Sequence, residues 1–195
     1  MPFNPSKLEA YAAEHHVPIL HPESVFALTK YIREHQILSI LEVGTAIGYS
    51  AMQMASVNPL IHVTTLERDP NRLEEATRFI HEADMKFQVE VIFMDALDYV
   101  PSSTFDLIFI DAGKAQYQVF FERFTPYLKP GGVVICDNYY LHGLTVDNAP
   151  KHKRTMARKL EAFKAFLSSH PDFITTILDV GDGLSVSVLQ PTKKA

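Results

Sequence analysis

Short apolar runs alternate with amphipathic segments along most of the chain, and turn residues bound each run. Nearly continuous apolar runs are typical of parallel strands that are covered on both faces. Five such runs are predicted strands: 39–44, 62–67, 89–95, 105–111 and 133–138. Three segments with apolar residues at helical spacing are predicted helices: 47–57, 69–83 and 115–128.

Helical patterns also flank this alternating region. Segments 5–16 and 22–36 open with helix-start residues, and a basic helix is predicted over 152–169. Strands 173–180 and 183–190 follow, around a Gly-Asp-Gly turn. The alternation predicts an α/β fold of the Rossmann-like type, a mostly parallel sheet with helices on both faces. The closing hairpin makes one strand antiparallel.

The composition suits one domain over residues 1–195. The chain has 47% apolar and 21% charged residues, and no apolar run reaches the roughly 18 residues of a membrane helix. The amino terminus lacks the apolar stretch of a secretory signal, and a single cysteine, Cys136, excludes an intrachain disulfide. We therefore expect a cytoplasmic protein without a membrane partner. The net charge of −5 argues against non-specific coating of nucleic acid.

Acidic residues recur at the carboxyl ends of the predicted strands. In open α/β sheets, ligands bind beyond these strand ends, where the strand order switches. A purely structural sheet does not require acidic residues along one rim, so the recurrence indicates a ligand site. The residues are Glu42, Glu67, Asp95, Asp111 and Asp137 with Asn138.

A glycine-containing loop, LEVGTAIGYS, joins the first of these strands to a helix. Gly44 and Gly48 permit a close approach of the backbone to a ligand. Ala46 and Tyr49 stand where the dinucleotide fingerprint G-x-G-x-x-G requires glycines. The loop therefore argues against a nicotinamide dehydrogenase, although by itself it is also compatible with a structural turn.

Two acids near this loop favour a cationic cofactor. Glu42 lies two residues before the first glycine, where it would repel a pyrophosphate and attract a cation. S-adenosylmethionine carries a sulfonium and an ammonium group and lacks phosphate. Glu67, at the end of the second strand, is placed to accept hydrogen bonds from the ribose hydroxyls. We predict S-adenosylmethionine as the cofactor.

Two further predicted strands end in carboxylates, one of them with an amide beside it, and an amine follows in the loop after the other. Asp111 ends one predicted strand, and Asp137 with Asn138 ends the next, so three oxygen ligands would converge in a manner that suits Mg²⁺. Lys114 follows three residues after Asp111, and a lysine beside a divalent cation can act as a base. Alternatively, Asp111 caps the next helix, Asp-Asn forms only a turn, and Lys114 pairs with a surface acid.

A basic segment follows the Asp-Asn pair. Residues 151–159 include five lysines or arginines and no acid: Lys151, Lys153, Arg154, Arg158 and Lys159. Such a segment is compatible with a solvated helix face and equally with a surface that contacts phosphates.

Three motifs in this order resemble those of the cation-dependent O-methyltransferases, the family that includes catechol and caffeoyl-CoA methyltransferases. They are LEVGTAIGYS, DAGKAQY and CDN, and the closing GDGLSVSVL is also similar to that family's hairpin. The resemblance covers about residues 8–190. It implies a fold that binds S-adenosylmethionine, with seven strands in the order 3-2-1-4-5-7-6, amino-terminal helices and a homodimeric assembly.

The resemblance also implies roles for individual residues. Asp111, Asp137 and Asn138 become ligands of Mg²⁺ or another divalent cation, with Lys114 as the catalytic base beside Asp111. The residues that it places at the cofactor are Ile19, Glu42, Gly44, Ser50, Glu67, Ala96 and Asp111.

Two departures bear on the substrate. The chain has no tryptophan, and Gly113 stands where the animal catechol enzymes have one; no insertion is evident that would grip a coenzyme A tail. Within the family, the compact form with GTAIGYSA is similar to bacterial tRNA 5-hydroxyuridine methyltransferases. The resemblance thus implies formation of 5-methoxyuridine at the wobble position. The anticodon loop would then contact Lys151, Lys153, Arg154 and Arg158.

Other functions remain open at this point. The main alternative is an O-methyltransferase that acts on a small catechol-like molecule. A binding module with an inactive site is a further alternative, although the complete set of Lys114 and three metal ligands argues against it.

Overall fold

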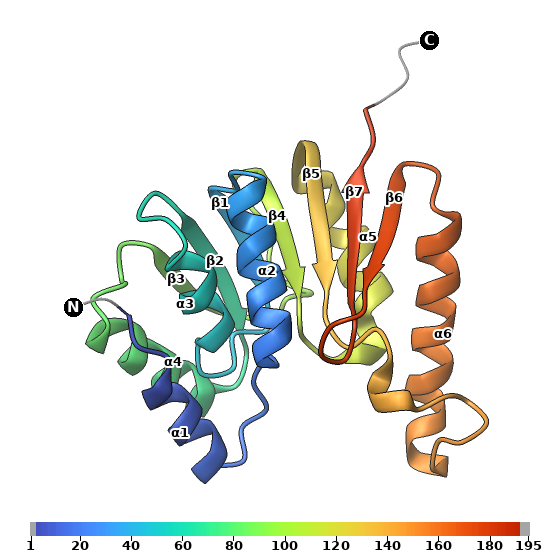
Figure 1. The fold of residues 1–195 in the computed structure, drawn as a ribbon, viewed down its shortest axis with the longest axis horizontal. Helices are drawn as coiled ribbons and strands as arrows, with labels where there is room; N and C mark the ends of the chain where they lie inside the picture. The colour runs from blue at the N-terminus through green and yellow to red at the C-terminus, as the bar shows by residue number, and fades with distance from the viewer. Residues whose placement is uncertain (1–2, 192–195) are drawn as a thin grey trace.

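The computed structural model describes residues 3–191, through which a seven-stranded sheet runs in the order β3-β2-β1-β4-β5-β7-β6 (Figure 1). β7 is antiparallel to both of its neighbours, and the other neighbouring strands are parallel. The predicted sheet is therefore confirmed. The strands are β1 Ser39–Val43, β2 His62–Glu67, β3 Val89–Phe93, β4 Phe105–Ile110, β5 Leu128–Cys136, β6 Phe173–Leu178 and β7 Leu184–Leu189.

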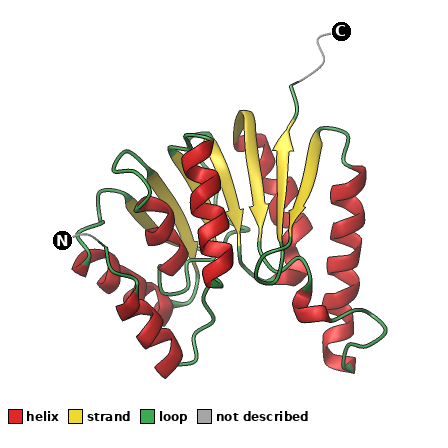
Figure 2. Cartoon of the chain, viewed as in Figure 1, coloured by secondary structure: helices red, strands yellow, loops and turns green. Residues whose placement is uncertain are grey.

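Helices cover both faces of the sheet (Figure 2). Successive strand residues alternate between two apolar cores, as the pleat requires: Ile40 packs into one core and Leu41 into the other. One face carries α1 Ser6–Glu14, α2 Pro22–Glu34, α3 Tyr49–Ala55 and α4 Pro70–Glu82. The other carries α5 Tyr117–Phe124 and α6 Arg154–Ser169.

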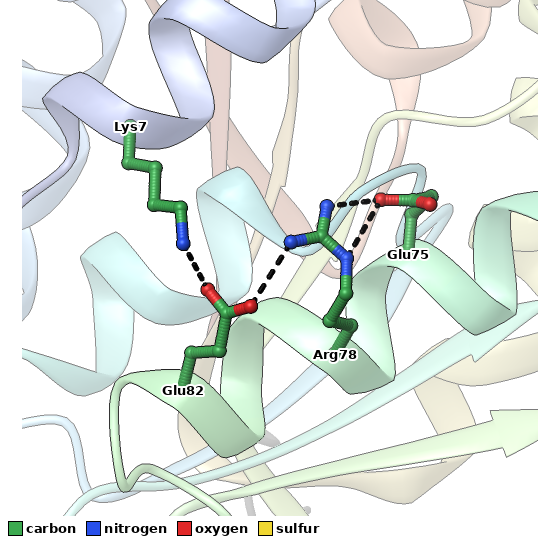
Figure 3. A network of polar contacts seen from close by, with 4 residues as sticks. All are labelled: Lys7, Glu75, Arg78 and Glu82. Carbon is green, nitrogen blue, oxygen red and sulfur yellow. Dashed lines mark hydrogen bonds and ion pairs between the residues drawn. The ribbon is translucent and has the colours of Figure 1, made fainter.

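Polar contacts hold α1 against α4 (Figure 3). Glu82 accepts from Lys7 of α1 and from Arg78 of its own helix, and Arg78 also pairs with Glu75. These groups are partly exposed, so solvent screens the pairs and each adds little to stability. The network anchors the first turn of α1 on α4. The chain that follows α1 passes the carboxyl ends of the parallel strands, where residues 18–21 share a cavity with the strand ends.

The segment between β4 and β5 differs from the prediction. Instead of one helix over 115–128, α5 lies between two 3-10 turns, Lys114–Gln116 and Thr125–Tyr127. Pro126 in the second turn cannot donate a backbone hydrogen bond, which favours the end of the helix there. β5 begins at Leu128, earlier than predicted, with a register shift against β4 between Phe105 and Leu107.

β4 and β5 each end one residue before a predicted carboxylate ligand of the metal. β4 ends at Ile110 and β5 at Cys136, so Asp111 and Asp137 lie just beyond the sheet. Among residues 3–191, none of the helices is both long and apolar enough to cross a membrane.

Candidate active site

A cavity of about 660 Å³ lies at the carboxyl ends of the parallel strands. The segment after α1 forms one wall, through Pro18, Ile19, Leu20 and His21. Of the residues predicted for the site, all but Glu42 line this cavity: Ile19, Gly44, Ser50, Glu67, Ala96, Asp111, Lys114, Asp137 and Asn138. The fold therefore brings together residues that lie up to about 120 positions apart in the chain.

The glycine loop that begins at Gly44 packs between β2 and the end of β4. Gly44 has φ +106°, and a Cβ there would lie 2.7 Å from the carbonyl oxygen of Asp111. The backbone N–H groups of Gly44 and Thr45 both donate to the Leu66 carbonyl at 3.2 Å. Only glycine combines this backbone conformation with such close packing. The loop thereby exposes its backbone to the cavity.

The Glu67 carboxylate is fixed by backbone donors. Its Oε2 accepts from Ala46 N at 2.8 Å, and its Oε1 accepts from Arg68 N and Asp69 N at 2.9 Å. An ionised carboxylate has about four acceptor positions, so roughly one remains for a ligand hydroxyl. Glu67 lines the cavity in a fixed orientation, and it also holds the glycine loop in place.

Glu42 lies beneath the glycine loop and outside the cavity wall. Its side chain is completely buried and accepts hydrogen bonds from Ser50 Oγ and Thr65 Oγ1. Burial, assisted by the charge of Glu67, raises the pKa of Glu42 to about 7. Ser50 links Glu42 to the cavity, since Ser50 does line it.

The two metal-ligand candidates with carboxylates, Asp111 and Asp137, follow directly after paired residues of neighbouring strands. Burial raises the pKa of Asp111 well above its usual range, and the nearby charge of Asp137 adds to this effect. Burial likewise raises the pKa of Asp137, against a backbone hydrogen bond from Asn138 and the charge of Lys114, which lower it. A positive charge close to both carboxylates would favour their ionised forms.

The same carboxylates fit a divalent cation. Asp137 Oδ1 is buried and accepts no hydrogen bond from any described residue. A buried oxygen without a partner is costly unless a ligand satisfies it. No group of three or more His, Cys, Asp or Glu residues in the described chain could hold a metal. A cation here would thus be held by two carboxylates and the amide of Asn138, all oxygen donors of the kind that Mg²⁺ prefers.

The structure also bears on the alternatives for these residues. No side chain caps the 3-10 turn that begins at Lys114 or α5 after it, so Asp111 is not a helix cap. Within residues 3–191, Lys114 makes no ion pair within 4 Å, although its charge lowers the pKa of both Asp111 and Asp137. Asn138 does begin a turn, with φ 56° and a carbonyl that accepts from Leu141 N.

Sequence reasoning missed a polar pair at the cavity rim. His142 lines the cavity, and its backbone N–H donates to Asp182 Oδ1 at 2.6 Å from the turn between β6 and β7. His142 Nδ1 lies 3.3 Å from Asp182 Oδ2. Only the position of His142 four residues after Asn138 hinted at its location.

The basic segment is exposed at the start of α6. Lys151, Lys153, Arg154 and Arg158 are all exposed, and Arg154 Nε also donates to the Ala149 carbonyl at 3.1 Å. In Figure 1 the start of α6 lies at the end of the molecule towards which the parallel strands point. The segment and the cavity mouth therefore lie on the same side.

Comparison with known proteins places the chain in a family. Residues 21–189 match the O-methyltransferase family model. A catechol O-methyltransferase from Niastella koreensis is 32% identical, over 80% of this chain and 75% of that protein. The chain belongs to the O-methyltransferase family.

Solved structures agree in fold. A Staphylococcus aureus protein, provisionally assigned as a caffeoyl-CoA O-methyltransferase, is 36% identical with a TM-score of 0.90. The match covers 96% of this chain and 92% of that one. A Bacillus cereus O-methyltransferase in complex with S-adenosylhomocysteine (SAH) is 27% identical with a TM-score of 0.84, covering 97% and 93% of the two chains.

Proposed function

We propose that this protein transfers a methyl group from S-adenosylmethionine to a hydroxyl oxygen, with a divalent cation bound at the carboxyl ends of β4 and β5. The observation that carries this proposal is the convergence of Asp111, Asp137, Asn138 and Lys114 beside the glycine loop in one cavity. The B. cereus relative in complex with SAH, the demethylated product, supports the choice of cofactor.

Each group of residues in the site has a separate role in this reaction. Glu67 and the backbone around Gly44 would hold the cofactor, and Asp111, Asp137 and Asn138 would hold Mg²⁺. The cation, when bound, lowers the pKa of an acceptor hydroxyl beside it. Lys114, in its neutral form, accepts the hydroxyl proton. The new oxygen–carbon bond forms as the sulfur–carbon bond of the cofactor breaks, which leaves SAH and a protonated Lys114.

For the acceptor we propose 5-hydroxyuridine at the wobble position of tRNA, which would become 5-methoxyuridine. The 5-hydroxyl and O4 of this base are neighbours, so they can chelate one cation as a catechol does. The exposed basic segment, on the same side of the molecule as the strand ends that form the cavity, supports an RNA acceptor, since cationic side chains there can contact the phosphates of an unpaired loop. We also propose that the protein acts as a cytoplasmic homodimer.

A second candidate acceptor is a small catechol-like molecule. The names of the relatives favour it, because they include catechol O-methyltransferases from N. koreensis and Mycobacterium tuberculosis. The two acceptors require the same metal and base, and they differ only in the need for the basic segment.

The test is methyl transfer from labelled cofactor to tRNA that carries 5-hydroxyuridine, in parallel with transfer to 3,4-dihydroxybenzoate. We expect labelled 5-methoxyuridine after digestion to nucleosides. Label on the phenol and none on the tRNA would replace the first acceptor by the second. No transfer to either compound would contradict the proposed reaction.

A further inference from the structure

Asn138 reaches the cavity from a loop, between two different anchors. The residue before it, Asp137, is tied to β4, because its backbone N–H donates to the Ile110 carbonyl at 3.3 Å. The residue after it, Tyr139, is tied to the turn between β6 and β7, where the Gly183 carbonyl accepts its N–H at 3.0 Å. Asn138 itself has a left-handed backbone, with φ 56°. The direction of its side chain therefore depends on the β6–β7 turn as well as on the sheet.

The β6–β7 turn packs closely against this loop. The backbone N–H of Tyr140 donates to the Asp182 carbonyl at 2.8 Å. Gly183 has φ +83°, and a Cβ there would lie only 2.8 Å from the ring of Tyr140. Glycine permits both the backbone conformation and the close approach. The turn thus lies directly against the chain that follows Asn138.

The loop continues through a strained segment, which the side chain of Asp182 contacts. Leu141, His142 and Gly143 all have positive φ, between 52° and 74°. Residues with a Cβ seldom adopt this conformation, and it persists where the surrounding structure imposes it. Asp182 Oδ1 accepts the backbone N–H of His142 at 2.6 Å, and Asp182 is only 6% exposed. A buried carboxylate therefore holds the backbone at the strained position.

Asp182 lies close to the candidate metal site without being part of its wall. It does not line the cavity, whereas Asp137, Asn138 and His142 do. Burial raises the pKa of Asp137, and the charge of Asp182 adds to this effect. Asp182 Oδ2 is buried and accepts no well-aligned hydrogen bond from a described residue, although His142 Nδ1 lies 3.3 Å away. Asp182 is thus placed to act on the site through the loop and through its charge.

We propose that Asp182 is a positioning residue for the metal: by accepting the His142 N–H it holds the loop that directs the amide of Asn138 at the cation. This proposal rests on the metal of the proposed function and is independent of the acceptor. Residues that orient metal ligands typically contribute about 10- to 100-fold to metal affinity.

Mg²⁺ titrations of three variants, measured by isothermal titration calorimetry, test the proposal. Asp182→Ala removes the acceptor of the His142 N–H and should weaken Mg²⁺ binding about 10- to 100-fold. Asp182→Asn keeps an oxygen that can accept this bond, so it should retain most of the affinity and lose only the effect of the charge. Asp172→Asn removes an exposed carboxylate at the other end of β6 and should bind Mg²⁺ as the natural protein does.

Hydrogen exchange in the natural protein is a second test, which decides the question if Asp182→Ala does not fold. If the bond at His142 helps to place Asn138, then the bond and the bound ion stabilise each other. Mg²⁺ should therefore slow exchange of the His142 amide, although this amide is not a metal ligand. Amides within α6 serve as the reference for any stabilisation of the whole protein.

Several outcomes would overturn the proposal. Equal Mg²⁺ affinity of Asp182→Ala and the natural protein contradicts it, and so does exchange at His142 that slows no more than in α6. Equal losses in Asp182→Ala and Asp182→Asn would mean that Asp182 acts through its charge alone, which also contradicts it. In these cases the proposed metal site stands. If the natural protein does not bind Mg²⁺, the proposed metal site fails, and this inference fails with it.

Discussion

Asp111 and Asp137 occupy matched positions just beyond two neighbouring parallel strands. Ile110 and Cys136, the residues before them, are Cα partners, and Asp137 N donates to the Ile110 carbonyl at 3.3 Å. The sheet therefore fixes two carboxylates side by side where burial raises the pKa of both. This juxtaposition destabilises the protein without a cation and creates an ion site when one is present.

Substitution of Asp137 by Asn should abolish Mg²⁺ binding without weakening the metal-free fold. The natural side chain has a buried oxygen without a partner and a raised pKa, so loss of its charge removes a destabilising interaction. We expect urea unfolding in EDTA to show Asp137→Asn as at least as stable as the natural protein. Added Mg²⁺ should stabilise only the natural protein, as ligand linkage requires.

A matched control is Asp98→Asn, which alters an exposed aspartate on the β3–β4 connection. It should retain the full response to Mg²⁺. If Asp137→Asn responds to the ion as strongly as Asp98→Asn does, these strand ends do not form the metal site.

Lys114 is predicted to act on the rate of methyl transfer rather than on cofactor binding. Loss of a general base lowers kcat by about 10²- to 10⁴-fold. Both Lys114→Met and Lys114→Arg should show this loss, since arginine keeps the charge but does not accept a proton at neutral pH. Single-turnover kinetics with either acceptor measures it. Full activity of Lys114→Arg would mean that Lys114 contributes only its charge.

The two glycines of the cofactor loop should respond differently to alanine. Both have positive φ, which costs a residue with a Cβ about 1–2 kcal/mol. At Gly44 the new methyl group would also lie 2.7 Å from the Asp111 carbonyl oxygen, whereas at Gly48 the nearest atoms are 3.6 Å away. We expect Gly44→Ala to lose more stability and to bind SAH far more weakly than Gly48→Ala. Calorimetric titration and urea unfolding test both effects, and similar values for the two variants would contradict the loop geometry.

Glu42 should make the metal-free protein less stable as the pH rises. Its pKa is about 7 when folded and 4.5 as an ordinary glutamate, so the folded state binds more protons between these values. The resulting loss of stability begins above pH 4.5, grows until the pH has passed 7 and then levels off, at about 3 kcal/mol in total. Glu42→Gln should flatten this part of the pH–stability curve. An unchanged curve would show that Glu42 titrates as an ordinary glutamate.

Charge reversal of Lys153 and Arg158 should separate the two acceptors. Each lost phosphate contact weakens tRNA binding. It also makes the slope of the logarithm of the binding constant against the logarithm of the salt concentration less steep, by about 0.7 to 0.9 per contact. Turnover of a small phenol should stay unchanged, because neither residue lines the cavity. Lys86→Glu, which alters an exposed lysine between α4 and β3, is the control. Equal loss with the tRNA for Lys86→Glu would indicate a general charge effect.

Much of the fold was predictable because local pattern and tertiary structure agree. Apolar runs such as 105–111 became central strands, and Asp69 with Pro70 begins α4 as an N-cap with proline at the first helical position. The limits of α5 and the early start of β5 were not predictable, because a proline and a register shift decide them. Pattern alone does not report such tertiary adjustments.

The candidate site was predictable to the extent that strand ends meet at one edge. This rule brought Asp111, Asp137 and Asn138 together in advance. The rule did not predict the orientation of the Glu42 side chain. Glu42 lies inside β1 and faces Thr65 of β2 rather than the cavity. The pairing of His142 with Asp182 depends on a loop–hairpin contact that no spacing rule encodes.

The most direct test is transfer of labelled methyl from S-adenosylmethionine to tRNA containing 5-hydroxyuridine, measured with Mg²⁺, after chelation by EDTA, and after Mg²⁺ is restored. We predict labelled 5-methoxyuridine with the ion, none after chelation, and recovery on its return. Equal labelling in all three samples would contradict the central claim that these two strand ends place a cation beside the methyl donor.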